Sequence, residues 1–192
     1  MKLKFITVTF LLLFARGCDF YSTSLWFFEP GGMAGETNPL TRFLGVGWTG
    51  LIIVNVIIVS LILACYYYYL FHYRPLAMIN KPEKLLDFAS QLYFNEKGKL
   101  HRLLYKMPVN KKVFTAHLGY VMVWFVIVAS FLATFHNLCQ YYNVSFYNTY
   151  RDIVGRPLYV LYGLFILAFL WFQYKVIKKE YDETKGPTKI PS

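Results

Sequence analysis

Charged side chains are scarce in this chain, and negatively charged ones are the scarcest. Only 16% of its residues are charged, against about 25% in an average soluble domain, while 57% are hydrophobic. Ten acidic residues stand against twenty Lys and Arg, which leaves a net charge of +10. A soluble core of 192 residues does not need this much apolar surface. The composition therefore argues against an ordinary soluble domain and indicates a membrane protein.

Cysteine is also rare, with three residues, Cys18, Cys65 and Cys139. Their spacing forms no CxxC pair and no zinc pattern, so neither a disulfide framework nor a structural zinc site is expected. The basic residues lie almost wholly between apolar runs, which fits membrane topology better than a nucleic-acid footprint. We expect membrane lipid and no nucleic acid among the partners, and the sequence specifies no cofactor.

Four long apolar runs cover residues 5–28, 43–71, 113–135 and 157–177. Each exceeds the ~20 residues that a helix needs to cross the hydrocarbon of a bilayer. Backbone polar groups in lipid must bond within their own segment, so each run is predicted to be a helix. The prediction is an all-α fold, a four-helix transmembrane bundle that forms a single integral membrane domain over residues 1–192.

Basic residues are distributed very unequally between the two sides of these runs. The N-terminus, the loop at 72–112 and the C-terminal segment carry sixteen of them, and the opposite loops carry three. The positive-inside rule then places both termini, the long loop and the tail at 178–192 in the cytoplasm. This topology predicts an integral protein of a bacterial inner (plasma) membrane.

The loop at 72–112 holds two short amphipathic stretches separated by residues 95–98. The first follows Lys81-Pro82, and the second alternates Leu with Lys and Arg near residues 100–105. A basic amphipathic pair in this place predicts a cytoplasmic helical hairpin on the anionic inner leaflet. Docking to a partner protein is the alternative. The tail after residue 178 is polar and is expected to fray.

Two charges lie inside the first apolar run, where each costs about 2.5–3.5 kcal/mol on insertion scales. These are Arg16 and Asp19, which are three residues apart and so share one helix face. Thr23 lies four residues beyond Asp19 on the same face. This stripe is either a structural ion pair that orients the helix or part of a binding or catalytic site.

The segment after the first run carries a further carboxylate, Glu36, two residues before Asn38-Pro39. Asn at the N-cap and Pro at the first helical position are typical of a helix start. Glu36 would then lie beside the positive end of the next helix, which favours a carboxylate. It either serves that capping role alone or faces the Arg16–Asp19 stripe as a second carboxylate.

Other polar residues in the same, outer half of the predicted membrane region are candidates for an outward-opening pocket. They are Asn55, Thr134, His136, Asn137, Arg151, Asp152 and Arg156. Each also has a structural explanation. Asn55 is suited to a structural hydrogen bond with a neighbouring helix. His136 fits an interfacial position, and Arg151 and Arg156 fit positions near lipid headgroups.

The pattern Asp19-x3-Thr23, followed by Glu36-x-Asn38-Pro39-Leu40, resembles a family of small prokaryotic multi-pass membrane proteins of unknown function. The likeness covers residues 19–40. It implies that the stripe and the turn before the second helix belong together, and it implies no activity. That family often has a lysine within the following helix, where this chain has Asn55.

Three functional hypotheses follow. The leading one is a membrane-embedded binding or accessory protein whose polar site, in the outer half of the bilayer, holds a lipid headgroup, an ion or a partner helix. A membrane-protein partner or a second copy of the chain would then be its partner. Its binding residues would be Arg16, Asp19, Thr23, Glu36, Asn38, Asn55, Arg151 and Arg156.

The second hypothesis is an intramembrane enzyme that acts on a lipid or isoprenoid substrate. Its catalytic groups would be Asp19, Glu36 and His136, which would have to converge within hydrogen-bond or metal-ligand distance. The third is a small proton- or ion-coupled carrier that uses Asp19. The sequence leaves these alternatives open and does not say whether a metal is bound.

Overall fold

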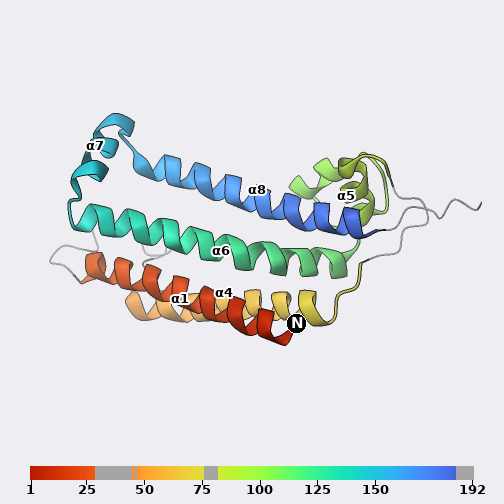
Figure 1. Ribbon diagram of the computed structural model, residues 1–192, viewed down its shortest axis with the longest axis horizontal. Helices are drawn as coiled ribbons and strands as arrows, with labels where there is room; N and C mark the ends of the chain where they lie inside the picture. The colour runs from red at the N-terminus through yellow and green to blue at the C-terminus, as the bar shows by residue number, and fades with distance from the viewer. Residues whose placement is uncertain (29–44, 46, 76–81, 185–192) are drawn as a thin grey trace, which may run out of the picture.

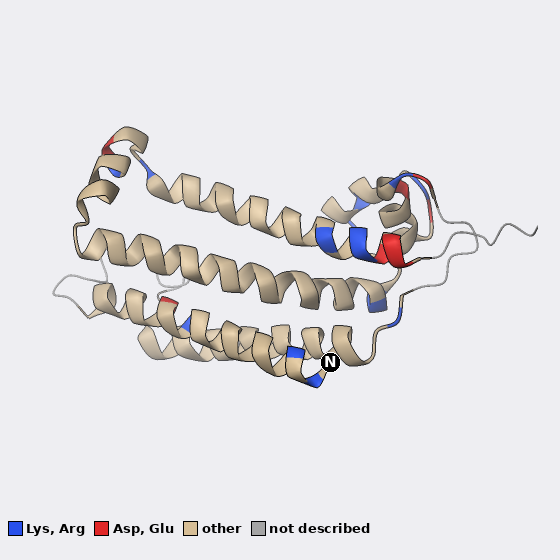
Figure 2. Cartoon of the chain, in the orientation of Figure 1, with Lys and Arg blue, Asp and Glu red and all other residues tan. Residues whose placement is uncertain are grey.

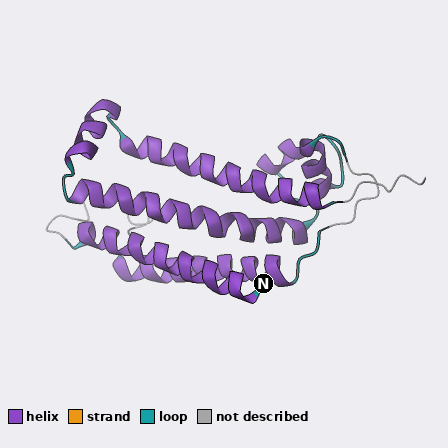
Figure 3. Ribbon diagram, viewed as in Figure 1, coloured by secondary structure: helices purple, strands orange, loops and turns teal. Residues whose placement is uncertain are grey.

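The computed structural model describes residues 1–28, 45, 47–75 and 82–184, and in these residues all regular structure is helical. Figure 1 shows the helices in space, and Figure 3 colours the described residues by secondary structure. The elements run in the order α1 (Lys2–Phe27), α4 (Trp48–Phe71), α5 (Leu85–Phe94), the 3-10 helix η1 (Leu100–Leu104), α6 (Lys111–Tyr141), α7 (Ser145–Val154) and α8 (Pro157–Glu183).

Three helices, α4, α6 and α8, are long and apolar enough to cross a membrane by length and composition. They contain 24, 31 and 27 residues, and even the shortest rises about 36 Å at about 1.5 Å per residue. Helix α1 has 26 residues and lies along α6 beside them. All four predicted helices are thus present, with α6 and α8 extending beyond the apolar runs that predicted them.

Helix α6 is the centre of the arrangement, because α1, α4 and α8 each pack along it. Figure 1 shows α1 and α4 on one side of α6 and α8 on the other. One buried apolar cluster joins α1, α4 and α6 through residues such as Leu12, Tyr66 and Val123. A second cluster joins α5, α6 and α8. The helices therefore form layers about α6.

Gly119 sets how closely α4 approaches α6. A Cβ atom added at this position would lie 2.5 Å from the carbonyl oxygen of Cys65 and 2.6 Å from the backbone nitrogen of Tyr66. No side chain larger than hydrogen fits there without moving the α4 backbone. The close crossing explains why an apolar helix contains a glycine at this point.

The loop between α4 and α6 differs from its prediction. The apolar face of α5 is buried against α6 and α8, with Phe88, Leu92 and Tyr93 each at most 1% exposed, so this face does not lie on lipid. The second stretch forms only the short 3-10 helix η1. Asn95 turns the chain between the two with φ of 59°. The hairpin is therefore one docked helix followed by a short 3-10 helix.

The two ends of the molecule differ in charge. We call them the α5 end, where α1 begins and α8 ends, and the α7 end. Figure 2 shows Lys and Arg gathered mainly at the α5 end, with the stretches between the ends almost free of charge except midway along α1. The predicted tail at 178–192 also begins as structure, because α8 continues to Glu183.

Candidate functional site

The two charges midway along α1, Arg16 and Asp19, bind each other, and Arg16 links α1 to two further helices. The Arg16 guanidinium forms an ion pair with the Asp19 carboxylate, and its other amino group donates to Oδ1 of Asn55 on α4. Arg16 also donates to the Ser130 hydroxyl of α6 at 3.1 Å. We call these four residues the Arg16 cluster. It joins α1, α4 and α6 through one side chain.

The Arg16 cluster is closed by its own groups. The side chains of Arg16 and Asp19 are 20% and 16% exposed. The Asn55 amide is held in turn, because its nitrogen donates to the backbone oxygen of Leu51 at 2.8 Å. Arg16 donates its hydrogen bonds to a carboxylate, an amide oxygen and a hydroxyl of the protein itself. Such contacts between helices stabilise their packing. The sequence predicted Asp19 and Asn55 as partners of this stripe and missed Ser130.

Polar contacts between α1 and α6 continue from the Arg16 cluster toward the α7 end. The Asn137 side-chain nitrogen donates to the hydroxyls of Ser22 and Thr23 at 3.2 and 3.4 Å. The indole of Trp26 donates to the backbone oxygen of Asn137 at 3.3 Å. Thr23, predicted as a binding residue, therefore serves the α1–α6 contact.

His136 lies on another face of α6 and has a different partner. Its Nδ1 atom is hydrogen-bonded to the Tyr147 hydroxyl of α7. At about 100° per residue, the six positions from Ser130 turn the helix face by about 120° away from α1. Asp19 and His136 thus serve separate contacts, which is not the convergence that the enzyme hypothesis requires. Glu36 and Asn38 lie outside the described residues.

The structure does bring three of the predicted residues at the α7 end together. His136, Arg151 and Arg156 line one open pocket of about 410 Å³, together with Gln140 and residues at the start of α8. Arg156 donates to the Tyr159 hydroxyl at 2.9 Å. Arg151 and Asp152 are exposed on α7. This pocket is separate from the Arg16 cluster, so the single outward site predicted from the sequence is divided in two.

A second buried polar group at the α5 end was not predicted. Glu180 of α8 is 4% exposed and His117 of α6 is 1% exposed. One Glu180 oxygen lies 2.6 Å from Nε2 of His117, and the other accepts a hydrogen bond of 2.6 Å from the Tyr73 hydroxyl. On the far side of the ring, Nδ1 of His117 lies 2.9 Å from the Tyr93 hydroxyl.

Gln173 completes this group by donating to the Tyr93 hydroxyl at 2.6 Å. Every member is satisfied when Tyr93 donates to Nδ1 of His117 and Nε2–H of His117 donates to Glu180. Burial, followed by the hydrogen bond to Glu180, raises the pKa of the Tyr73 phenol. Burial likewise raises the pKa of Tyr93. We call Tyr73, Tyr93, His117, Gln173 and Glu180 the Glu180 cluster.

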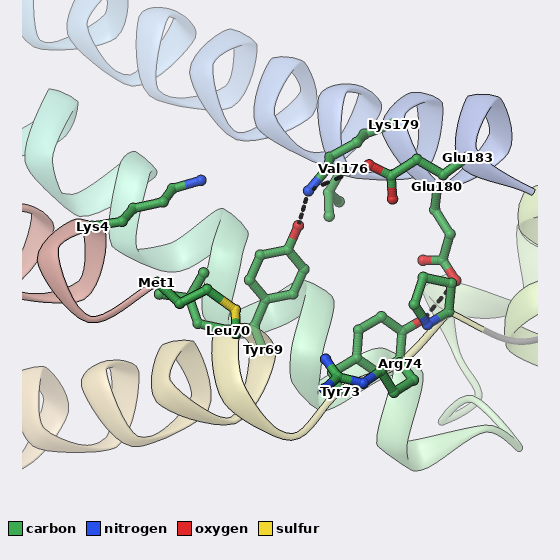
Figure 4. Close-up of a pocket in the computed structure, with 11 residues that line it drawn as sticks. Met1, Lys4, Tyr69, Leu70, Tyr73, Arg74, Val176, Lys179, Glu180 and Glu183 are labelled. Atoms are coloured by element: carbon green, nitrogen blue, oxygen red, sulfur yellow. Dashed lines mark hydrogen bonds and ion pairs between the residues drawn. The ribbon is translucent and has the colours of Figure 1, made fainter.

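Beside the Glu180 cluster, α1, the end of α4 and α8 enclose a basic pocket of about 240 Å³. Its cationic side chains are Lys4, Arg74 and Lys179, which come from three different elements (Figure 4). Lys179 lies 3.4 Å from the Tyr69 hydroxyl and 3.8 Å from the Glu183 carboxylate. Leu70 and Val176 add apolar surface.

Within residues 1–28, 45, 47–75 and 82–184, no three His, Cys, Asp or Glu side chains gather in a way that could hold a metal ion. Cys18, Cys65 and Cys139 are free thiols. The polar groups described here are suited to hydrogen bonding and to binding anions.

Comparison of the chain with protein-family models, with curated proteins and with solved structures gives no match. The resemblance over residues 19–40 therefore stays a prediction. Asn55 accepts a hydrogen bond from Arg16 of α1.

Proposed function

We propose that this chain is a multi-pass membrane protein that acts as a non-enzymatic binding or accessory component. The observation that carries this proposal is the closed Arg16 cluster, in which Arg16 holds the Asp19 carboxylate and is itself held by Asn55 of α4 and Ser130 of α6. A catalytic or transporting carboxylate needs access to substrate or water, whereas a structural pair needs only its partners. Asp19 has the second arrangement.

In this proposal α1 crosses the bilayer with α4, α6 and α8, giving four spans. Its length of 26 residues and its packing along α6 support this, and the paired charges lower the penalty of insertion. The α5 end lies in the cytoplasm because it carries most of the basic residues. The localisation is then a bacterial inner membrane, with both termini cytoplasmic.

Cysteine labelling tests the four-span topology. In a chain whose three cysteines are replaced by alanine, single cysteines are placed at Phe28, Tyr105 and Ile153, which are 69%, 72% and 80% exposed. A maleimide that cannot cross membranes should react with Phe28→Cys and Ile153→Cys on intact cells. Tyr105→Cys should react only after permeabilisation. Reaction at Ile153→Cys but not at Phe28→Cys in intact cells would show that α1 does not cross.

Chemical modification of Asp19 separates the accessory role from the enzyme and carrier hypotheses. A hydrophobic carbodiimide reacts with protonated carboxyl groups within membranes. It should leave Asp19 unmodified in the natural chain, because the Arg16 guanidinium stabilises the carboxylate. In the Arg16→Leu variant the partner is lost, and peptide mass spectrometry should detect the adduct. An adduct on Asp19 in the natural chain contradicts the accessory role and favours a carrier.

A further inference from the structure

The basic pocket at the α5 end combines charge and apolar surface in a way that the Arg16 cluster does not. Lys4 lies in the first turn of α1, Arg74 follows α4, and Lys179 lies in the last turns of α8 (Figure 4). All three are exposed, so a ligand that arrives from solvent or from the membrane surface can reach their charges. Because three elements each contribute a cation, the pocket exists only in the folded chain.

The acidic residues of this pocket are largely engaged by other groups. Both oxygens of Glu180 are occupied by Tyr73 and His117, and Glu183 is half exposed at 3.8 Å from Lys179. The tyrosine hydroxyl of Tyr69 lies near Lys179 and adds a polar group that can donate to an anion. The pocket therefore offers cations and a hydroxyl, with a single loosely held competing carboxylate.

The position of the pocket restricts the kind of anion that fits. It lies at the end of the molecule where α4 and α8 end, and both helices are long and apolar enough to cross a membrane. Leu70 of α4 and Val176 of α8 supply its apolar lining. A ligand that is anionic at one end and apolar at the other matches both surfaces. Basic pockets between membrane helices are suited to phosphate-containing headgroups.

The Glu180 cluster makes this pocket rigid. Tyr73 immediately precedes Arg74 and is fixed to α8 by its hydrogen bond of 2.6 Å to Glu180. His117 fixes the same carboxylate to α6 at 2.6 Å. The segment that carries Arg74 is therefore held against the helix that carries Lys179 before any ligand arrives. Such preorganisation reduces the ordering that binding requires.

We propose that the basic pocket formed by Lys4, Arg74 and Lys179 binds the phosphate group of an anionic membrane lipid. This rests on the membrane location stated under Proposed function, but not on the orientation of the chain in the membrane. The guanidinium of Arg74 and the two ammonium groups contact the phosphate oxygens, and the acyl chains lie along the apolar helix surfaces.

The test uses the full chain, purified and placed in lipid nanodiscs or detergent, with phosphatidylglycerol as the probe and phosphatidylcholine as the neutral reference. Binding is measured by native mass spectrometry and by the rise in thermal stability on lipid addition. Phosphatidylglycerol should bind more tightly than phosphatidylcholine. The triple variant Lys4→Gln, Arg74→Gln, Lys179→Gln should lose about tenfold or more of its apparent affinity for phosphatidylglycerol.

A matched control removes the same charge from the same end of the molecule. Lys97→Gln, Lys106→Gln and Lys112→Gln are exposed positions that do not line the pocket, and this triple variant should keep its affinity within about twofold. Equal losses in the two triple variants would reduce the effect to general surface charge and overturn the proposal. So would equal binding of the two lipids by the natural chain.

Glu183→Gln keeps the test decisive if the triple variant folds poorly. This change removes an exposed carboxylate beside Lys179, so affinity for phosphatidylglycerol should rise about twofold to threefold. An unchanged or lower affinity would contradict the proposal. Inorganic phosphate alone is the third probe, and stabilisation by it equal to that by the lipid would assign the pocket to free phosphate and overturn the lipid assignment.

The two proposals fail in different ways. Binding in nanodiscs does not depend on which face of the cell membrane the α5 end occupies, so a reversed topology in the labelling experiment leaves the lipid result intact. Conversely, a chain with the expected labelling pattern but no lipid preference loses only the pocket assignment.

Discussion

The Arg16 cluster and the Glu180 cluster both include a residue of α6, but they join it to other elements in opposite ways. The first contains an ion pair within one helix, formed by residues three apart, to which α4 and α6 add neutral partners. The second takes its acid from α8 and its imidazole from α6, and it is almost completely buried. A local pair finds its partner as soon as its helix forms, whereas the Glu180 cluster exists only after four elements meet. We therefore expect the Glu180 cluster to be the more vulnerable of the two.

Removing the Glu180 carboxylate should have the largest effect. Glu180→Ala leaves the Tyr73 hydroxyl and the His117 ring without their buried acceptor, and loss of one partner from such a pair costs about 3–5 kcal/mol. The free energy of unfolding in detergent, measured by denaturant titration, should fall by this amount. Glu183→Ala, on the same helix with a side chain 53% exposed, is the control and should change it by less than about 1 kcal/mol. Similar losses for both variants would mean that Glu180 is not the structural centre of its cluster.

A double-mutant cycle on the Arg16 cluster should give an intermediate effect. Arg16→Leu and Asp19→Leu each remove one side of the ion pair, and each should cost about 1–3 kcal/mol of unfolding free energy. The double variant removes both charges together, so it should cost clearly less than the sum of the single changes. Additive losses would show that the two side chains are not coupled. The same unfolding titration measures all three variants.

The alkaline limit of stability should also depend on the Glu180 cluster, and the expected effect of a small rise above pH 10 is modest. The folded-state pKa values of Tyr73 and Tyr93 are raised, so the stability that these phenols provide is fully present below their ordinary pKa of 10.0. It is lost as the pH rises above 10 toward the folded-state values, by up to about 1.4 kcal/mol per pH unit and phenol. Phenolate absorbance and unfolding free energy measure this together.

Variants locate that alkaline loss. Tyr73→Phe should make the decline of stability above pH 10 less steep, while Tyr105→Phe, at a position 72% exposed, should leave the slope unchanged. The Arg16 cluster contains no phenol, so the double variant of Arg16 and Asp19 should retain the natural slope. An equal change of slope in all three would show that the titrating groups lie elsewhere.

What the sequence predicted and what it missed follow the contrast between contacts within one helix and contacts between elements. The helices and the Arg16–Asp19 pair depend on apolar runs and on spacing within one helix, and a single sequence records both. Ser130 was missed because one serine in an apolar run gives no sign of which helix it faces. Glu180 was missed because it lies in a charged stretch typical of a solvated tail, and its burial depends on the docking of α5 against α6 and α8.

The short helix α7 was missed for a different reason. Its ten residues lie in a polar stretch between two apolar runs, and a search for long apolar runs does not detect a helix there. A hydrogen bond between His136 and Tyr147, eleven positions apart, joins α7 to α6.

The segment that forms α5 was correctly identified as amphipathic, but its apolar face was wrongly assigned to lipid. Periodicity shows that a face is apolar, but only the packed structure shows which surface covers it.

The central place of α6 has a consequence for synthesis of the chain. Helices α1 and α4 leave the ribosome before α6, against which both of them pack. For a time they therefore lack this packing partner. During that interval Arg16 can already hold Asp19, because both lie on α1, and Asn55 of α4 can join them next. Ser130 arrives last and completes the contact as α6 emerges. The order of the polar partners along the chain thus matches the order in which the helices become available for assembly.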